Sequence, residues 1–90
     1  MYNIVYTREA KRAIDKLNNK VKLQIKDNIE RLAQEPTSGK PLTHELKGLW
    51  SYRCGVYRII YQIHHHEVMV LILTIGHRKD VYEKLSRRIS

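Results

Sequence analysis

Residues 48–82 constrain the fold most, because they read as three consecutive β-strands at 49–53, 56–63 and 67–75. The third strand carries an almost unbroken apolar run at 68–75, which is typical of a strand buried on both faces of a sheet. We therefore expect it to lie in the interior of the sheet. The run is far shorter than the roughly 20 residues that a membrane-spanning helix needs, so we expect no membrane association.

A hairpin turn at Cys54-Gly55 sets the expected register of the first two strands. Side chains alternate between the two faces of a sheet. One face then holds Ser51, Arg53, Val56 and Arg58, and the other holds Trp50, Tyr52, Tyr57, Ile59 and Tyr61. Long arginine side chains in a helix-covered core would be costly unless they were paired. We therefore expect helices to cover the aromatic face and to leave the arginines accessible.

Upstream of these strands, residues 2–6 read as a short strand and two amphipathic helices follow at 8–17 and 20–34. Thr7 is a good N-cap for the first helix, and Pro36 ends the second because the residue before a proline disfavours helical geometry. The short break between the helices predicts an antiparallel helical hairpin. Neither apolar stripe can bury itself, so both helices should pack on the sheet.

Residues 37–47 read as a loop, and the apolar spacing after Gly76 indicates a short C-terminal helix. Ninety residues suffice for one domain, covering 1–90. The sequence thus predicts a small α+β fold. An N-terminal strand and a helical hairpin would pack on a mainly antiparallel four-stranded sheet, with a short C-terminal helix.

The charge balance is strongly basic, with a formal net charge of +8 and an isoelectric point near 9.8. Such a charge favours a polyanionic partner, either nucleic acid or an acidic protein, although it also serves solubility. The single cysteine, Cys54, cannot form an internal disulfide and suits the reducing cytosol. The N-terminus has no apolar run of a secretory signal, so we expect a cytoplasmic protein and an inert Cys54.

Three adjacent histidines at 64–66 raise the possibility of a metal site. Neighbouring side chains of an extended segment point to opposite sides, whereas metal ligands must converge on one point. A solvated turn is the better interpretation, and we expect no metal or other cofactor.

Three motifs in the chain are informative in combination: PLTHELKGLWS at 41–51, GVYRIIY at 55–61 and IGHRKDVY at 75–82. In this order and spacing they resemble the RelE/ParE toxin superfamily of bacterial toxin–antitoxin pairs. The first motif resembles the YoeB branch in particular. The resemblance covers essentially the whole chain and implies the small RelE-like fold.

This resemblance implies a ribosome-dependent mRNA endonuclease without a metal, in which the 2′-hydroxyl attacks the adjacent phosphate and leaves a 2′,3′-cyclic phosphate. It places the family's phosphate-clamping arginine at Arg58 and its second active-site arginine, thought to assist the leaving group, at Arg78. The base-stacking tyrosine falls on Tyr82. The implied partners are the ribosome with its mRNA and an acidic RelB-like antitoxin, in a toxin–antitoxin complex expected to be oligomeric.

The sequence lacks the residues that serve as the general base in the family. Leu49 and Ser51 stand where the RelE branch has lysines, and Lys40 stands where the YoeB branch has a glutamate. Histidine exchanges protons near neutral pH, so His77 is the first candidate for acid or base. The weaker candidates are His44 and Glu45.

Further cations are expected to support RNA binding, because arginine and lysine both bind phosphate oxygens. The residues in question are Arg53, Lys47 and Lys79. For the arginines the structural alternative is an incidental surface ion pair. For Tyr82 it is a packing role in the C-terminal helix.

Two other functions stay open from the sequence. ParE-like members of the superfamily poison DNA gyrase and are not known as nucleases, and the missing base favours them. A plain basic RNA-binding module is the third possibility. Cuts in ribosome-bound mRNA would favour the nuclease over both.

Overall fold

The computed structural model describes residues 1–89, apart from the side chains of Lys84 and residues 86–89. Its helices are α1 (Arg8–Asp15), α2 (Asn19–Gln34) and α3 (Asp80–Ile89), and two short 3₁₀ turns are η1 (Pro36–Ser38) and η2 (His44–Leu46). Its strands are β1 (Asn3–Tyr6), β2 (Lys40–Pro41), β3 (Trp50–Cys54), β4 (Tyr57–His64) and β5 (Met69–His77).

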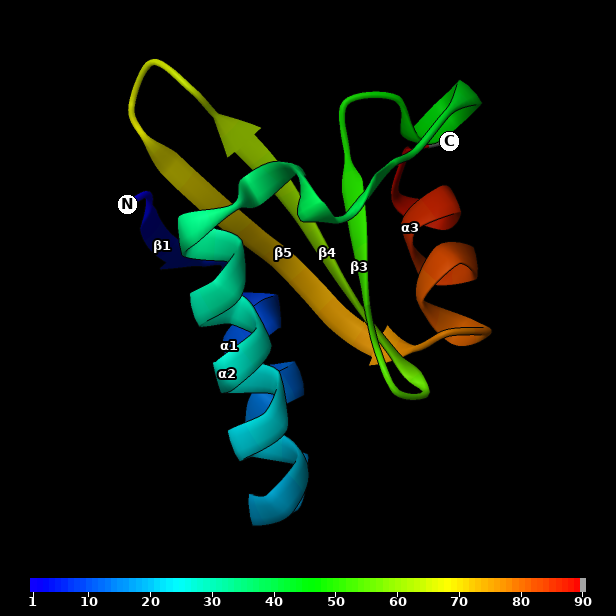
Figure 1. Ribbon diagram of the computed structural model, residues 1–90. Helices are drawn as coiled ribbons and strands as arrows, with labels where there is room; N and C mark the ends of the chain where they lie inside the picture. Colours follow the sequence, from blue (N-terminus) through cyan, green and yellow to red (C-terminus); the bar gives the residue numbers. More distant parts are fainter. Residues whose placement is uncertain (90) are drawn as a thin grey trace.

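The strands form one sheet in the order β1-β5-β4-β3-β2 (Figure 1). β1 pairs with β5 in parallel, and all other neighbours are antiparallel. β5 lies between β1 and β4, which confirms that the apolar run at 68–75 forms an interior strand. The predicted α+β class, helical hairpin and C-terminal helix are confirmed as well.

Both helices of the hairpin begin at side-chain caps. The Thr7 hydroxyl accepts a hydrogen bond from the Ala10 amide at 3.0 Å, and the Asn18 side chain accepts one from the Val21 amide at 2.9 Å. Each cap satisfies a backbone donor that has no partner within the first helical turn. Thr7 also donates its hydroxyl proton to the Leu73 carbonyl at 2.6 Å, so this cap joins α1 to β5.

The sheet separates two apolar clusters, because adjacent residues of a strand point to opposite faces. Ile59 packs with Ile25 and Ile29 of α2 in the larger cluster, whereas Ile60 packs with Val81 and Leu85 of α3 in the smaller one. The larger cluster also takes up Trp50, Tyr52, Tyr57 and Tyr61. The helical hairpin therefore covers the aromatic face, as predicted, while α3 packs on the other face (Figure 1).

The β3–β4 hairpin has a different register from the predicted one. Its turn lies at Gly55-Val56 instead of Cys54-Gly55, so Arg53 pairs directly with Arg58. A turn at Cys54-Gly55 would pair Ser51 with Arg58, whereas Ser51 pairs with Ile60, so the predicted register is wrong. Gly55 takes the first turn position with φ of +60°, a conformation that glycine adopts at little cost.

A fifth strand, β2, was predicted to be loop, and the four-stranded sheet is corrected accordingly. β2 pairs Lys40 with Ser51 and Pro41 with Trp50. Two residues are too few to show an alternating pattern, and a proline is tolerated only where no ladder amide is needed, as at a sheet edge. β2 is the edge strand next to β3.

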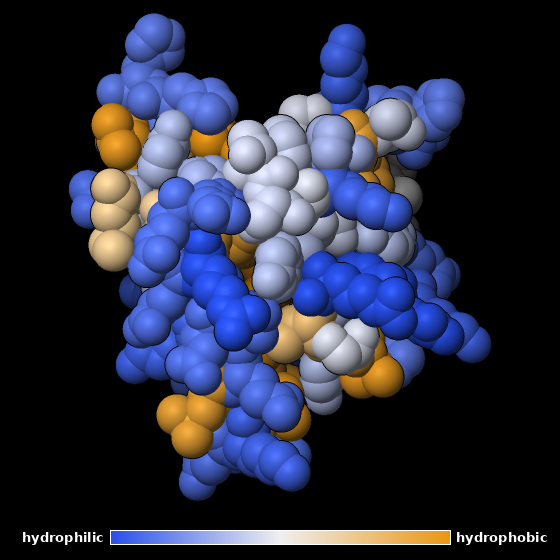
Figure 2. All heavy atoms as spheres, in the orientation of Figure 1, coloured by the Kyte–Doolittle hydropathy of each residue, from blue (hydrophilic) through white to orange (hydrophobic). Residues whose placement is uncertain are grey.

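Hydrophilic side chains cover most of the face seen in Figure 2, including the surface over α2, and apolar ones appear only in small separate areas. This surface agrees with the 29% of charged residues in the chain. Among the described helices, none combines the length and apolarity required to cross a membrane.

Candidate functional site

Arg53 and Arg58 lie opposite each other on β3 and β4, on the face away from the helical hairpin. Ser51 pairs with Ile60 on the same face, and Ile60 belongs to the cluster beneath α3. The side chain of Arg58 is half-buried, and its guanidinium makes a long contact of 3.4 Å to the Tyr57 carbonyl. The two guanidinium groups thus share one patch beside α3, as the sequence predicted.

This patch forms part of a cleft of about 530 Å³. Its lining residues come from η1, β2, β3, β4 and α3: Ser38, Gly39, Lys40, Pro41, Leu42, Ser51, Tyr52, Arg53, Arg58 and Tyr82. Three of these carry a positive charge and none carries a carboxylate. Like charges with no counter-ion among the lining residues favour binding of an anion.

Tyr82 reaches the cleft from α3, and its hydroxyl is fixed by a buried partner. The Tyr82 hydroxyl and the Ser51 hydroxyl lie 2.8 Å apart in a hydrogen bond. Ser51 is only 7% exposed, so the bond is partly shielded from solvent. It holds the half-buried Tyr82 ring against the same patch as Arg58.

Arg78 follows the end of β5 and does not line the cleft. Arg58 pairs with Gly76, and the Arg78 amide donates a hydrogen bond to the Val56 carbonyl at 2.9 Å. This bond continues the β4–β5 ladder by one pair beyond Tyr57 and His77, which places Arg78, two residues after Gly76, on the Arg58 side of the sheet. Its side chain is exposed next to the start of α3.

His77 lies on the other face of β5. It pairs with Tyr57, and the two rings meet edge to face with centroids 6.4 Å apart. Tyr57 packs on the larger apolar cluster beneath the helical hairpin. The structure therefore does not bring His77 together with Arg58, because adjacent residues of β5 point to opposite sides of the sheet.

The remaining predicted residues are exposed and lie outside the cleft. His44 and Glu45 belong to η2, Lys47 directly follows it, and Lys79 lies between β5 and α3. Of the residues predicted from sequence, the structure gathers Arg53, Arg58 and Tyr82 in one cleft.

The sequence interpretation missed Lys40 as a member of this cleft. Lys40 pairs with Ser51 across β2 and β3, and paired residues place their side chains on the same face. The available signal was the resemblance noted above, which aligns Lys40 with the YoeB-branch glutamate. Because residues 37–47 were predicted to be loop, the position of Lys40 on the sheet was not predicted.

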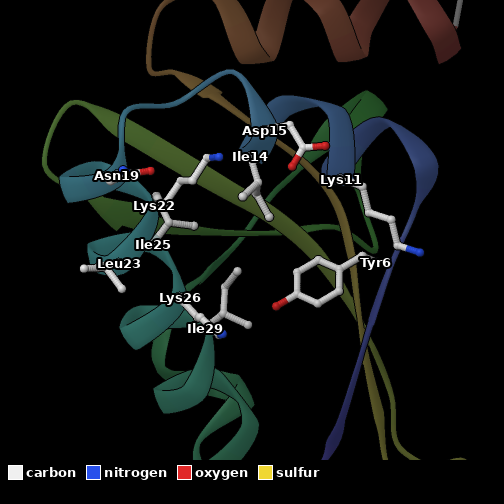
Figure 3. A pocket seen from close by; sticks show the side chains of 10 residues that line it. All are labelled: Tyr6, Lys11, Ile14, Asp15, Asn19, Lys22, Leu23, Ile25, Lys26 and Ile29. Atoms are coloured by element: carbon white, nitrogen blue, oxygen red, sulfur yellow. The ribbon is translucent and has the colours of Figure 1, made fainter.

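A larger cavity, about 720 Å³, lies between α1 and α2 (Figure 3). Tyr6, Ile14 and Ile29 point into it, and Lys11 and Lys22 stand at its margin. None of the residues predicted for the site lines this cavity. The predicted residues that share a cavity, Arg53, Arg58 and Tyr82, lie in the smaller cleft instead.

Cys54 packs against the larger apolar cluster and its Sγ accepts a hydrogen bond from the Asn28 side chain at 3.1 Å. Burial raises the pKa of the Cys54 thiol, and a thiol kept protonated is a poor nucleophile. The histidine triplet ends β4 and enters the turn, where His64 bonds Gln62 and His65 bonds Tyr2. In the part of the chain that is described, no three potential ligand side chains group as a metal site would require.

Comparison with known proteins gives a consistent result. The profile of the family described as "ParE toxin of type II toxin-antitoxin system, parDE" matches residues 4–82. The chain is 35% identical over 85 residues to toxin RelG of Mycobacterium tuberculosis, covering 92% of this chain and 98% of RelG.

Solved structures agree with this match. The toxin–antitoxin complex RelBE2 of Mycobacterium tuberculosis contains a chain that is 35% identical, with a TM-score of 0.80 over 84% of this chain and 90% of the other. The isolated RelE toxin of E. coli has a TM-score of 0.74 at 22% identity, with both chains fully covered. The second likeness supports the fold alone.

Proposed function

We propose a function from one established premise: this chain belongs to the RelE/ParE toxin superfamily and is a toxin of a type II toxin–antitoxin system. The proposed activity is cleavage of ribosome-bound mRNA. The 2′-hydroxyl attacks the adjacent phosphate, the bond to the 5′-oxygen breaks, and a 2′,3′-cyclic phosphate remains. This reaction inhibits translation and needs no cofactor in the mechanism that we propose.

One observation carries this proposal: Arg53 and Arg58 face a common cleft, and none of the described residues that line it is acidic. In-line cleavage concentrates negative charge on the phosphorane oxygens, and preorganised cations stabilise such charge. A guanidinium can bond two phosphate oxygens at once. We assign this clamping role to Arg58 and a supporting role to Arg53.

The two remaining residues act at the ends of the scissile linkage. Arg78, on the Arg58 side of the sheet, would stabilise the charge that develops on the leaving 5′-oxygen. The Tyr82 ring would stack on an unpaired base, the usual way in which single-stranded RNA is held. The Ser51 hydroxyl fixes the position of that ring.

The proposed rate enhancement comes mainly from positioning and charge stabilisation. Among the described residues, neither a histidine nor a carboxylate lines the cleft, and His77 lies on the other face. We therefore assign His77 no step in the chemistry. Lys47 and Lys79 are exposed and would contribute to the general attraction of RNA phosphates.

A second candidate function is poisoning of DNA gyrase. The match to the ParE family profile over residues 4–82 favours it, as does the lack of a histidine or carboxylate along the described part of the cleft. In this alternative the cationic cleft is a binding surface instead of a catalytic centre.

An antitoxin partner follows from the relatives, since the mycobacterial and E. coli toxins were solved in complexes named RelBE2 and RelBE. We propose that this chain pairs with an acidic RelB-like protein in the cytoplasm. The net charge of +8 suits such a partner and also suits ribosomal RNA.

The test is in vitro translation with primer extension on a defined mRNA, in parallel with a DNA-supercoiling assay with purified gyrase. We expect cuts in ribosome-bound mRNA, and we expect them to disappear when the nucleotide 5′ to the cut carries a 2′-deoxyribose. Intact mRNA together with gyrase-dependent DNA breaks would reject the nuclease and establish the alternative.

A further inference from the structure

We propose that Lys40 is a third phosphate ligand of the cleft, delivered from the edge strand β2 to the RNA phosphate that Arg58 clamps. The inference rests on the proposed function in one respect, because it takes the bound anion to be an RNA phosphate. It extends the site from two strands of the sheet to three.

Lys40 has the required position. It pairs with Ser51, which is two residues from Arg53 on β3, and Arg53 pairs with Arg58 on β4. Residues two apart on one strand share a face, so all three cations project from the same face. All three line the cleft of about 530 Å³.

The segment that carries Lys40 is fixed by Tyr61. The Tyr61 hydroxyl donates a hydrogen bond to the Pro36 carbonyl at 2.6 Å and accepts one from the Gly39 amide at 3.2 Å. Tyr61 is fully buried, and its bond to Pro36 is buried as well, whereas the bond from Gly39 is partly buried. η1 and the start of β2 are thereby anchored through the sheet.

Gly39 adds to this anchoring through close packing. A β-carbon at this position would meet the Tyr61 hydroxyl and come within 2.7 Å of the Ser51 carbonyl oxygen. Only a residue without a side chain lets β2 approach β3 so closely. Lys40 is therefore attached to a well-held backbone, although its own side chain is exposed.

The chemistry of the three cations is complementary. An arginine fork bonds two oxygens in a fixed plane, whereas a lysine ammonium is a compact charge with three rotatable donors. A phosphate has more oxygens than one fork can reach, so an ammonium from β2 can bind an oxygen that Arg58 leaves open. Among the side chains that the structure describes, no acidic one lines the cleft to compete for Lys40.

The test measures binding apart from cleavage. A short single-stranded RNA with 2′-O-methyl groups cannot be cut by 2′-hydroxyl attack, and fluorescence anisotropy reports its affinity for the intact protein. We compare Lys40→Gln, Lys40→Arg and Arg58→Ala with Lys20→Gln, an exposed lysine at the start of α2. Urea unfolding of each variant checks that the fold is retained.

We expect Lys40→Gln to bind more weakly than Lys20→Gln and to reduce the slope of log affinity against log salt by roughly 0.7, the value for one phosphate contact to a single strand. Lys40→Arg should restore most of the affinity. If Lys40→Gln binds the RNA as tightly as Lys20→Gln while Arg58→Ala binds it more weakly, the role of Lys40 is rejected and the phosphate-binding role of Arg58 is retained. If Arg58→Ala also binds like the wild type, the proposed site itself fails.

Discussion

At the scale of single residues, Ser51 and Tyr82 form a hydrogen-bonded pair that joins α3 to the sheet. A partly buried hydroxyl pair of this kind contributes about 1 kcal/mol to stability. We expect Ser51→Ala and Tyr82→Phe each to lower the free energy of unfolding by about that amount. The double variant should lose little more than either single one, because one shared bond is removed. Urea unfolding measures all three, and fully additive losses would contradict the pair.

His77 provides a second prediction at this scale. Its ring contacts Tyr57 on the face of the sheet away from Arg58. We therefore expect His77→Ala to keep mRNA cleavage within a few-fold of the wild type. A loss of a hundredfold, comparable to removal of an oxyanion-type contact, would mean that His77 acts in the reaction and that our placement of the chemistry is wrong.

At the scale of elements, the two helix caps differ in the number of hydrogen bonds that the capping side chain makes. Asn18 caps α2 by one bond from Val21, whereas Thr7 caps α1 and also bonds the Leu73 carbonyl of β5. Loss of a cap typically costs about 1 kcal/mol. We expect Asn18→Ala to cost about that much and Thr7→Ala to cost more, with Thr7→Ser recovering most of the loss. Equal losses in thermal or urea unfolding would show that the bond to β5 adds nothing.

Elements with a clear apolar period could be predicted from sequence, and those without one could not. The stripe of Ile25, Ile29 and Leu32 identified α2 and its buried face, and alternation identified the face of Arg53 and Arg58. β2 could not be predicted because two residues show no alternating pattern. The position of Lys40 on the sheet could therefore not be predicted either. The side of His77 could not be inferred before the register of β4 and β5 was known.

At the scale of the whole molecule, burial of ionisable groups makes the free energy of unfolding depend on pH in the alkaline range. Burial raises the pKa of Tyr61 to about 12, and it also raises the pKa of Tyr6 and Cys54. Above the ordinary pKa of each group, the unfolded chain releases a proton that the folded chain keeps. The unfolded state then binds fewer protons, so the free energy of unfolding falls as pH rises.

We therefore expect urea unfolding to show full stability from these groups at neutral pH and a progressive loss above about pH 9. Tyr61→Phe should reduce the steepness of this loss between about pH 10 and 12, because the phenol no longer titrates. A wild-type stability that is flat or rising over this range would contradict the burial of these groups.

The proposed function depends on the cleft beside α3, and the rate of cleavage of ribosome-bound mRNA tests it most directly. Arg58→Ala is compared with Arg12→Ala, an exposed arginine of α1 outside the cleft. We predict that Arg58→Ala lowers the rate about a hundredfold or more with its fold intact, while Arg12→Ala stays near the wild type. An Arg58→Ala variant that cleaves as fast as Arg12→Ala would contradict the account.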